Sequence, residues 1–100
     1  MTSRPPSRAV IAASASIGEQ LVTWRKLLGL TAAQVADRAG IARGTLARLE
    51  HGDGGISLAG FLAVTQALGQ LQRVVTATDP YETDLGRIRA DDKLPKRVRR

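Results

Sequence analysis

Glycines divide the middle of the chain into short segments, and this punctuation limits the fold more than any other feature. The residues that end these segments are Gly29, Gly40, Gly52 and Gly69. Before each of them apolar residues recur every three or four positions, which is typical of a helix that buries one face. Glycine commonly follows the last residue of a helix because it adopts the left-handed conformation at little steric cost. The sequence therefore predicts a bundle of four short helices.

Hydroxyl, carboxylate and amide side chains indicate where these helices begin. Ser16 and Glu19 have the spacing of a capping box, in which each side chain accepts a free backbone N–H of the first turn. Thr31 and Gln34 form a second such pair, and Ser57 precedes the fourth apolar stripe. The four helices are expected within residues 16–28, 31–39, 43–51 and 57–68.

Both ends of the chain differ from this middle part. Residues 1–15 contain Pro, Ser, Arg and Ala without an apolar period, so we expect a flexible N-terminal arm. Residues 71–78 are rich in β-branched side chains and predict a strand, which would pair with its copy in a second chain to form a homodimer. Residues 79–100 are expected to form a polar tail with at most one weak helical turn, within residues 81–90. Residues 93–100 are expected to be either solvated or in contact with DNA or an acidic protein. Their basic residues are Lys93, Lys96, Arg97, Arg99 and Arg100.

The composition excludes most classes of enzyme and metalloprotein. The chain has no cysteine and a single histidine, His51, so a thiolate metal site or a histidine-based triad is not expected. We expect no catalytic residue, no metal and no cofactor. The net charge of +6 indicates a polyanionic partner. No run of about 18 apolar residues is present, and residues 10–15 are too short for a signal peptide, so we expect a cytoplasmic protein without membrane contact.

Residues 30–52 carry the pattern that indicates the function. They place two short helices on either side of a turn of three or four residues, which is the arrangement of a helix-turn-helix. The segment closely resembles the Xre/Cro-type helix-turn-helix of phage and bacterial repressors, and the resemblance covers about residues 17–69. The matching residues are Leu30, Thr31, Gln34, Ala36, Ala39, Gly40, Ile41, Arg43, Thr45, Leu46, Arg48, Leu49, Glu50 and Gly52. It implies a mostly α, lambda-repressor-like bundle in which residues 16–70 are the DNA-binding domain.

The resemblance also implies roles for particular residues. An ion pair between Arg25 and Glu50 would tie the first helix to the end of the third. The third helix would enter the major groove of DNA, and the second would cross the phosphate backbone. The residues expected to contact DNA are Gln34, Arg43, Gly44, Thr45, Ala47 and Arg48.

Two arginines supply the main hydrogen-bond donors of this site, and two alanines depart from the pattern of the family. Arg43 and Arg48 are the long hydrogen-bond donors on the exposed face, and arginine either reads guanine through O6 and N7 or binds a phosphate. Many relatives have a phosphate-binding glutamine at the position of Ala32, and most cap the third helix with Ser or Thr at the position of Ala42. These two departures weaken the attraction to phosphate and the start of the third helix.

Together these features predict a sequence-specific transcription regulator, a repressor that binds a palindromic operator as a homodimer. A short helical domain followed by a strand and a polar tail also resembles the Hip-type antitoxins. Those proteins repress their own operon and bind a kinase-like toxin, so this resemblance implies a toxin as a further partner. The alternative is a protein-interaction module, toxin-neutralising or scaffolding, whose helix-turn-helix binds DNA weakly or not at all.

Overall fold

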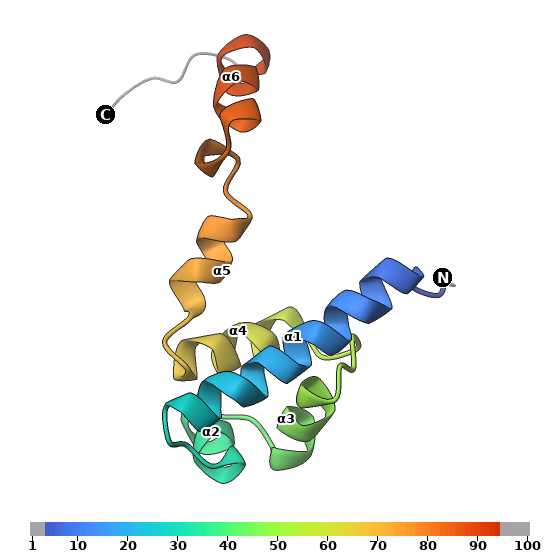
Figure 1. Ribbon diagram of the computed structural model, residues 1–100, viewed down its shortest axis with the longest axis vertical. Helices are drawn as coiled ribbons and strands as arrows, with labels where there is room; N and C mark the ends of the chain where they lie inside the picture. The colour runs from blue at the N-terminus through green and yellow to red at the C-terminus, as the bar shows by residue number, and fades with distance from the viewer. Residues whose placement is uncertain (1–3, 95–100) are drawn as a thin grey trace.

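The computed structural model describes residues 4–94, which form a four-helix unit and an arm (Figure 1). The elements are α1 (Arg8–Leu27), α2 (Ala32–Ala39), α3 (Arg43–Glu50), α4 (Leu58–Ala67), α5 (Leu71–Ala77), the 3₁₀ turn η1 (Pro80–Glu82) and α6 (Asp84–Lys93). Helices α1 to α4 pack together, while α5, η1 and α6 extend from them and are called the arm. The first turns of α1 project from the unit in another direction.

The core of the four-helix unit is small and almost entirely aliphatic. Its buried residues are Leu21, Val35, Ala36, Leu46, Leu49, Val64, Thr65 and Leu68. The one polar member, Thr65, donates its hydroxyl to the carbonyl oxygen of Leu62 at 2.8 Å, so no buried donor is lost. Each of the four helices contributes to this core, which therefore fixes their mutual arrangement.

The predicted helix ends in the middle of the chain are confirmed. Thr31 and Gln34 form a complete capping box: the N–H of Gln34 donates to Thr31 Oγ1 at 3.1 Å, and the N–H of Thr31 donates to Gln34 Oε1 at 2.9 Å. Ser57 accepts the N–H of Gly60 at 3.0 Å at the start of α4. The four punctuating glycines have φ between 71° and 86°, the left-handed conformation that ends a helix.

The first helix is longer than predicted, and a start at Ser16 is wrong. Ser7 is the N-cap, and its Oγ accepts the N–H of Val10 at 3.2 Å. The alanine-rich residues 9–15 then continue the helix although they carry no apolar stripe, because alanine has the highest helix propensity. The expected boundary after residue 15 therefore does not match the structure, which is helical from Arg8.

Gly18 lies in the middle of α1, where this helix crosses the end of α3. A Cβ atom added to Gly18 would lie 2.5 Å from the carbonyl oxygen of Glu50 and 2.7 Å from that of Leu49. The segment that resembles a capping box is therefore a point of close helix packing, and its glycine permits the approach of two backbones.

The predicted strand at residues 71–78 is also wrong, since α5 occupies this segment and residues 4–94 contain no strand. The preference of β-branched residues for strands spans only about 1 kcal/mol and depends on context. Here Leu71 and Val74 are half-buried at a helical spacing of three, and α5 packs against α4. Arg73 places its guanidinium carbon 6.0 Å from the centroid of the Trp24 ring on α1. Packing against the four-helix unit thus outweighs the local preference.

The segment that follows is structured rather than a plain tail. Thr83 caps α6, and its Oγ1 accepts the N–H of Gly86 at 3.0 Å. The polar tail predicted from residue 79 therefore contains η1 and a ten-residue helix, α6, where a single weak helical turn within residues 81–90 was expected. The basic residues Lys96, Arg97, Arg99 and Arg100 lie outside the described residues.

Two glycine substitutions test the close approach of α1 and α3. We expect Gly18→Ala to lower the free energy of unfolding by about 1–3 kcal/mol, because the new methyl group meets backbone oxygens that cannot easily move. Gly44→Ala in α3 is the matched control: no atom lies within 4 Å of its added Cβ. Its gain in helix propensity should raise stability by about 0.5–1 kcal/mol. Urea unfolding followed by circular dichroism measures both; equal effects would contradict this account of Gly18.

Candidate nucleic-acid interface

The turn between α2 and α3 sets the angle between these two helices. Gly40 has φ 71°, and its N–H bonds to the carbonyl oxygen of Asp37 at 3.2 Å. The N–H of Ile41 then bonds to the carbonyl oxygen of Ala36 at 3.0 Å, which closes the end of α2. Ala36 and Leu46 are buried in the angle between the helices. The outer side of α3 is consequently left facing solvent.

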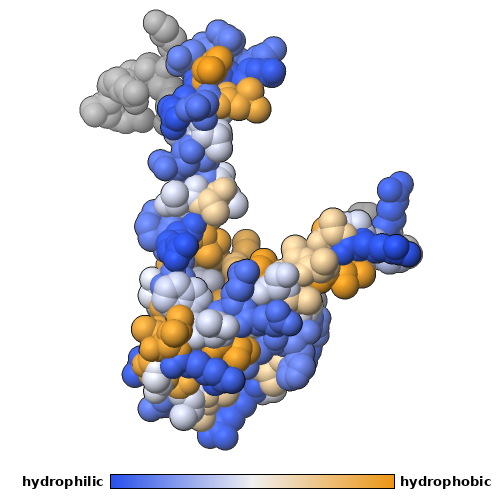
Figure 2. Space-filling model, viewed as in Figure 1, coloured by the Kyte–Doolittle hydropathy of each residue, from blue (hydrophilic) through white to orange (hydrophobic). Residues whose placement is uncertain are grey.

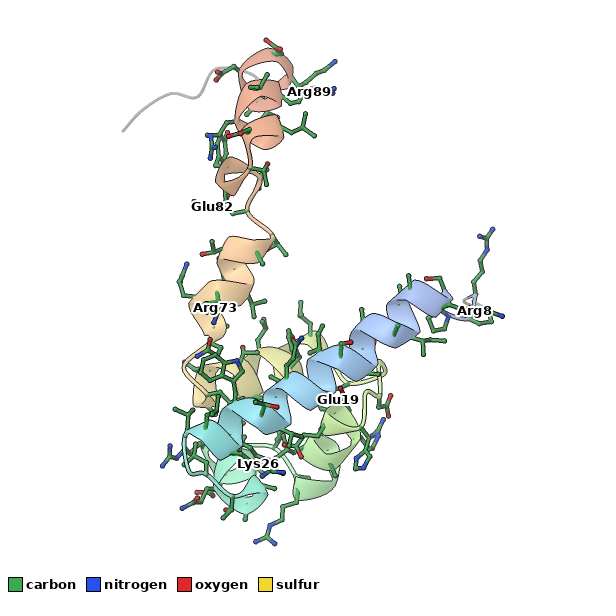
Figure 3. The ribbon with its side chains drawn as sticks, in the orientation of Figure 1. Arg8, Glu19, Lys26, Arg73, Glu82 and Arg89 are labelled. Atoms are coloured by element: carbon green, nitrogen blue, oxygen red, sulfur yellow. The ribbon has the colours of Figure 1, made fainter. Side chains whose placement is uncertain are left out.

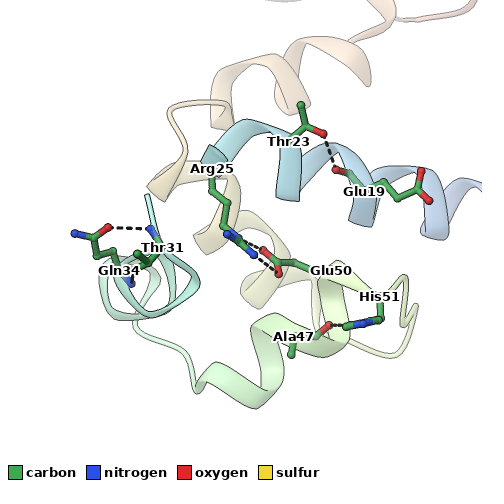
Figure 4. Close-up of polar contacts among 8 residues, drawn as sticks. All are labelled: Glu19, Thr23, Arg25, Thr31, Gln34, Ala47, Glu50 and His51. Atoms are coloured by element: carbon green, nitrogen blue, oxygen red, sulfur yellow. Dashed lines mark hydrogen bonds and ion pairs between the residues drawn. The ribbon is translucent and has the colours of Figure 1, made fainter. Parts of the chain in front are cut away.

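An ion pair fixes the other end of α3 to α1 (Figure 4). Arg25 donates from Nε to Glu50 Oε2 at 2.7 Å and from Nη2 to Glu50 Oε1 at 3.3 Å. The two side chains are only 17% and 9% exposed. The hydrogen bonds to Glu50 raise the pKa of Arg25 above its ordinary value, against the opposing effect of burial. The pair implied by the family resemblance is present, and its two-point geometry limits rotation of α3 about its axis.

The outer face of α3 presents the side chains that were expected to contact DNA. Arg43, Gly44, Ala47 and Arg48 are exposed, whereas Thr45 is half-buried. Gly44 has no atom within 4 Å of the position of a Cβ, so the backbone at this point is open to an approaching partner. Neither arginine is turned into the core, so both guanidinium groups are accessible to an approaching partner.

Gln34 lies on α2 and plays two roles. Its Oε1 accepts the N–H of Thr31 in the capping box (Figure 4). The amide nitrogen of the same side chain remains a donor at the exposed start of α2. Gln34 and Arg43 both line an open groove of about 430 Å³ between α2 and α3, with Asp37 on the same wall. The groove thus brings one donor from each helix of the motif to a common surface.

The start of α3 carries no side-chain cap, as its sequence indicates. Ala42 is the N-cap residue and has no side-chain hydrogen bond to the first turn of the helix. At the other end, Nδ1 of His51 lies 2.7 Å from the carbonyl oxygen of Ala47. His51 therefore closes the end of the helix as a polar residue, and its ring is exposed.

Sequence reasoning missed an acidic partner of Arg48. Arg48 Nε donates to Asp53 Oδ2 at 2.8 Å, and Asp53 Oδ1 accepts the N–H of Gly55 at 2.7 Å. The hydrogen bond from Gly55, followed by that from Arg48, holds the pKa of Asp53 below its ordinary value. The five-residue separation of Arg48 and Asp53 crosses the end of α3, so no helical spacing in the sequence points to this pair.

The described residues offer few features of other functional classes. Residues 4–94 contain no group of three or more His, Asp or Glu side chains that could hold a metal ion. Within the same range no helix has both the length and the apolar character that a membrane crossing requires.

Comparison with known proteins identifies the class that this geometry defines. A family model described as helix-turn-helix matches residues 21–71, which includes α2, the turn, α3 and α4. The chain therefore belongs to the helix-turn-helix family, and its motif is that of an Xre-type DNA-binding regulator. No curated protein and no solved structure gave a match.

Loss of the Arg25–Glu50 pair should be costly. We expect Glu50→Gln to lower the free energy of unfolding by about 3 kcal/mol, because it leaves a largely buried guanidinium without its counter-charge. Glu19→Gln, which changes an exposed glutamate of α1, is the matched control and should change stability by less than about 0.5 kcal/mol. Thermal and urea unfolding measure both. Equal values for the two variants would show that the pair has no such role.

Proposed function

We propose that the protein is a repressor that binds a palindromic operator as a homodimer, with α3 in the major groove and α2 across the phosphate backbone. The observation that carries the proposal is the outward face of α3, whose Arg43 and Arg48 are exposed on a helix held by the core and by the Arg25–Glu50 pair. A rigid helix with exposed guanidinium groups suits the reading of base edges. We place this function in the cytoplasm, with no catalysis and no cofactor.

Each side chain of the face has a proposed contact. Arg43 at the start of α3 reaches a guanine edge or a phosphate, and Arg48, five residues further along the helix, reaches a base. Ala47 offers a methyl contact to thymine, and the uncovered backbone at Gly44 allows close approach. Gln34 on α2 and Thr45 on α3 bind phosphate. Net charge +6 supplies the long-range attraction.

Selection of bound fragments from random DNA followed by titration tests this function. We expect one enriched palindrome, and we expect Arg43→Ala and Arg48→Ala each to lose about five- to hundredfold affinity for it. Arg89→Ala is the matched control: it removes the same charge from α6, far from α3 (Figure 3), and should change affinity by less than threefold at physiological salt. Enrichment of no sequence, or unchanged affinity in both α3 variants, would contradict the proposal.

Because residues 71–77 form α5 and not the predicted strand, the proposed homodimer needs another contact surface. The exposed apolar side of α6 in the arm supports one. α6 packs chiefly against η1, and its Leu85 and Ile88 are 63% and 62% exposed. Figure 2 shows apolar side chains at the far end of the arm, away from the four-helix unit. Their three-residue spacing puts them on one side of α6, so α6 of a second copy would cover both. The two recognition helices of such a dimer need a separation of about 34 Å.

Sedimentation equilibrium at micromolar concentration measures the dimer directly. We expect the wild type to be a dimer and Leu85→Ser/Ile88→Ser to be a monomer, because the double substitution removes the apolar contact surface. Leu27→Ser, which changes another exposed leucine at the end of α1, should remain dimeric. A monomeric wild type would overturn the homodimer.

The same apolar residues favour a second candidate. If the wild type is monomeric yet binds DNA, the exposed side of α6 is better suited to a partner of another sequence, as the kinase-like toxin of the Hip-type resemblance would be. If it binds neither DNA nor a second copy, a protein-interaction module with an inactive helix-turn-helix is the better description.

A further inference from the structure

Asp53 is held more firmly than an acidic residue in a surface loop usually is. Its side chain accepts Arg48 Nε with Oδ2 at 2.8 Å and the N–H of Gly55 with Oδ1 at 2.7 Å. Its own backbone N–H donates to the carbonyl oxygen of Arg48 at 2.9 Å. Asp53 is therefore joined to Arg48 through both backbone and side chain, and Gly55 fixes the orientation of the carboxylate.

The loop that carries Asp53 is itself fixed to α1. Gly52 has φ 86°, and a Cβ atom placed on it would lie 2.8 Å from Cα of Ala15. The backbone of the loop thus rests on the backbone of α1, about three turns before Arg25. This contact depends on the first turns of α1, and it gives the Asp53 carboxylate a stable base.

The way Arg48 is bound leaves its outer donors available. A guanidinium carries five N–H groups, and the hydrogen bond to Asp53 uses the one on Nε. The Nη1 and Nη2 groups carry the other four, and two of these are what a bidentate contact to guanine O6 and N7 requires. Arginine loses rotamer entropy when it is immobilised, and a side chain already held by Asp53 loses less on binding.

The carboxylate also changes what Arg48 contributes electrostatically. The pair carries no net charge, so it adds little to the sequence-independent attraction toward phosphate. An acidic side chain beside the DNA-facing surface lowers the affinity for DNA of any sequence. Its presence is useful if it orients the guanidinium group of the arginine toward a base. Arg48 with Asp53 is therefore suited to selecting a base rather than to binding the backbone.

We propose that Asp53 is a positioning residue that holds Arg48 so that its Nη groups meet a guanine in the major groove. This assignment rests on the proposed DNA-binding function and adds to it the residue that sets specificity at one base pair. It gives the two arginines of α3 different roles. Arg48 selects a base, whereas Arg43, for which no ion pair is found within residues 4–94, has no counter-charge and attracts a phosphate or a base.

Affinities of the full chain for the selected operator, and for versions changed at each base pair, test the assignment. The informative position is the one where Arg48→Ala abolishes the preference of the wild type, which should be about five- to hundredfold for a good bidentate contact. At that position Asp53→Ala should reduce the preference at least fivefold, while its affinity for unrelated DNA stays the same or rises. Asp53→Asn keeps an acceptor and should retain part of the preference.

Two controls separate positioning from a change of charge or of stability. Asp37→Ala removes an acid from the groove between α2 and α3 without touching Arg48, so it should raise affinity for all sequences and leave the preference unchanged. In the Arg48→Ala background, Asp53→Ala should not change the preference at all. Circular dichroism melting confirms that each variant is folded at the temperature of the titration.

Every other result decides against the assignment. If Asp53→Ala keeps the wild-type preference, or behaves as Asp37→Ala does, Asp53 acts only through its charge. If Arg48→Ala alters the preference at no position of a selected operator, the regulator remains but Arg48 reads no base. If the wild type selects no sequence, the proposed function and the role of Asp53 fail together.

Discussion

The contact between α1 and the end of α3 is the constraint on which the rest of the structure depends. A helix of eight residues is unstable alone in water, so the orientation of α3 comes from its tertiary contacts. Leu46 and Leu49 bind its inner side to the core. Gly18 lets the backbone of α1 approach its last turn, and Arg25 bonds to Glu50 at two points. A largely buried pair of this kind specifies geometry more surely than it adds stability.

This arrangement separates stability from recognition along a single short helix. The inner positions of α3 are filled by aliphatic side chains, while Arg43, Ala47 and Arg48 make no contribution to the buried core. Substitution of the outer side chains is therefore expected to leave the buried core, and with it the fold, unchanged. The ion pair of Arg48 with Asp53 belongs to the outer side, and it restrains a long side chain that the core does not reach.

The arm, unlike the four-helix unit, leaves large apolar side chains exposed. α5 packs against α4, but the apolar side chains of Leu85 and Ile88 on α6 find no cover within the described chain. The helix-turn-helix is complete without α6, since its core contains residues of α1 to α4 and the adjoining Leu68. The proposed dimer contact on α6 and the proposed DNA-binding face on α3 consequently lie in separate parts of a chain of 100 residues.

The sequence by itself determined the features that depend on a few neighbouring residues or on a strong family pattern. The caps at Thr31 and Ser57, the ends of α2 and α3, and the partner of Arg25 were all predictable, because glycine conformation and capping act over three or four residues. The early start of α1 depends on the local cap at Ser7 and on alanine helix propensity, whereas the tertiary structure alone decided the role of Gly18, the helical state of residues 71–77 and the pairing of Arg48 with Asp53. Each of these last three features depends on what packs against the segment, and packing outweighs local preferences of about 1 kcal/mol or less.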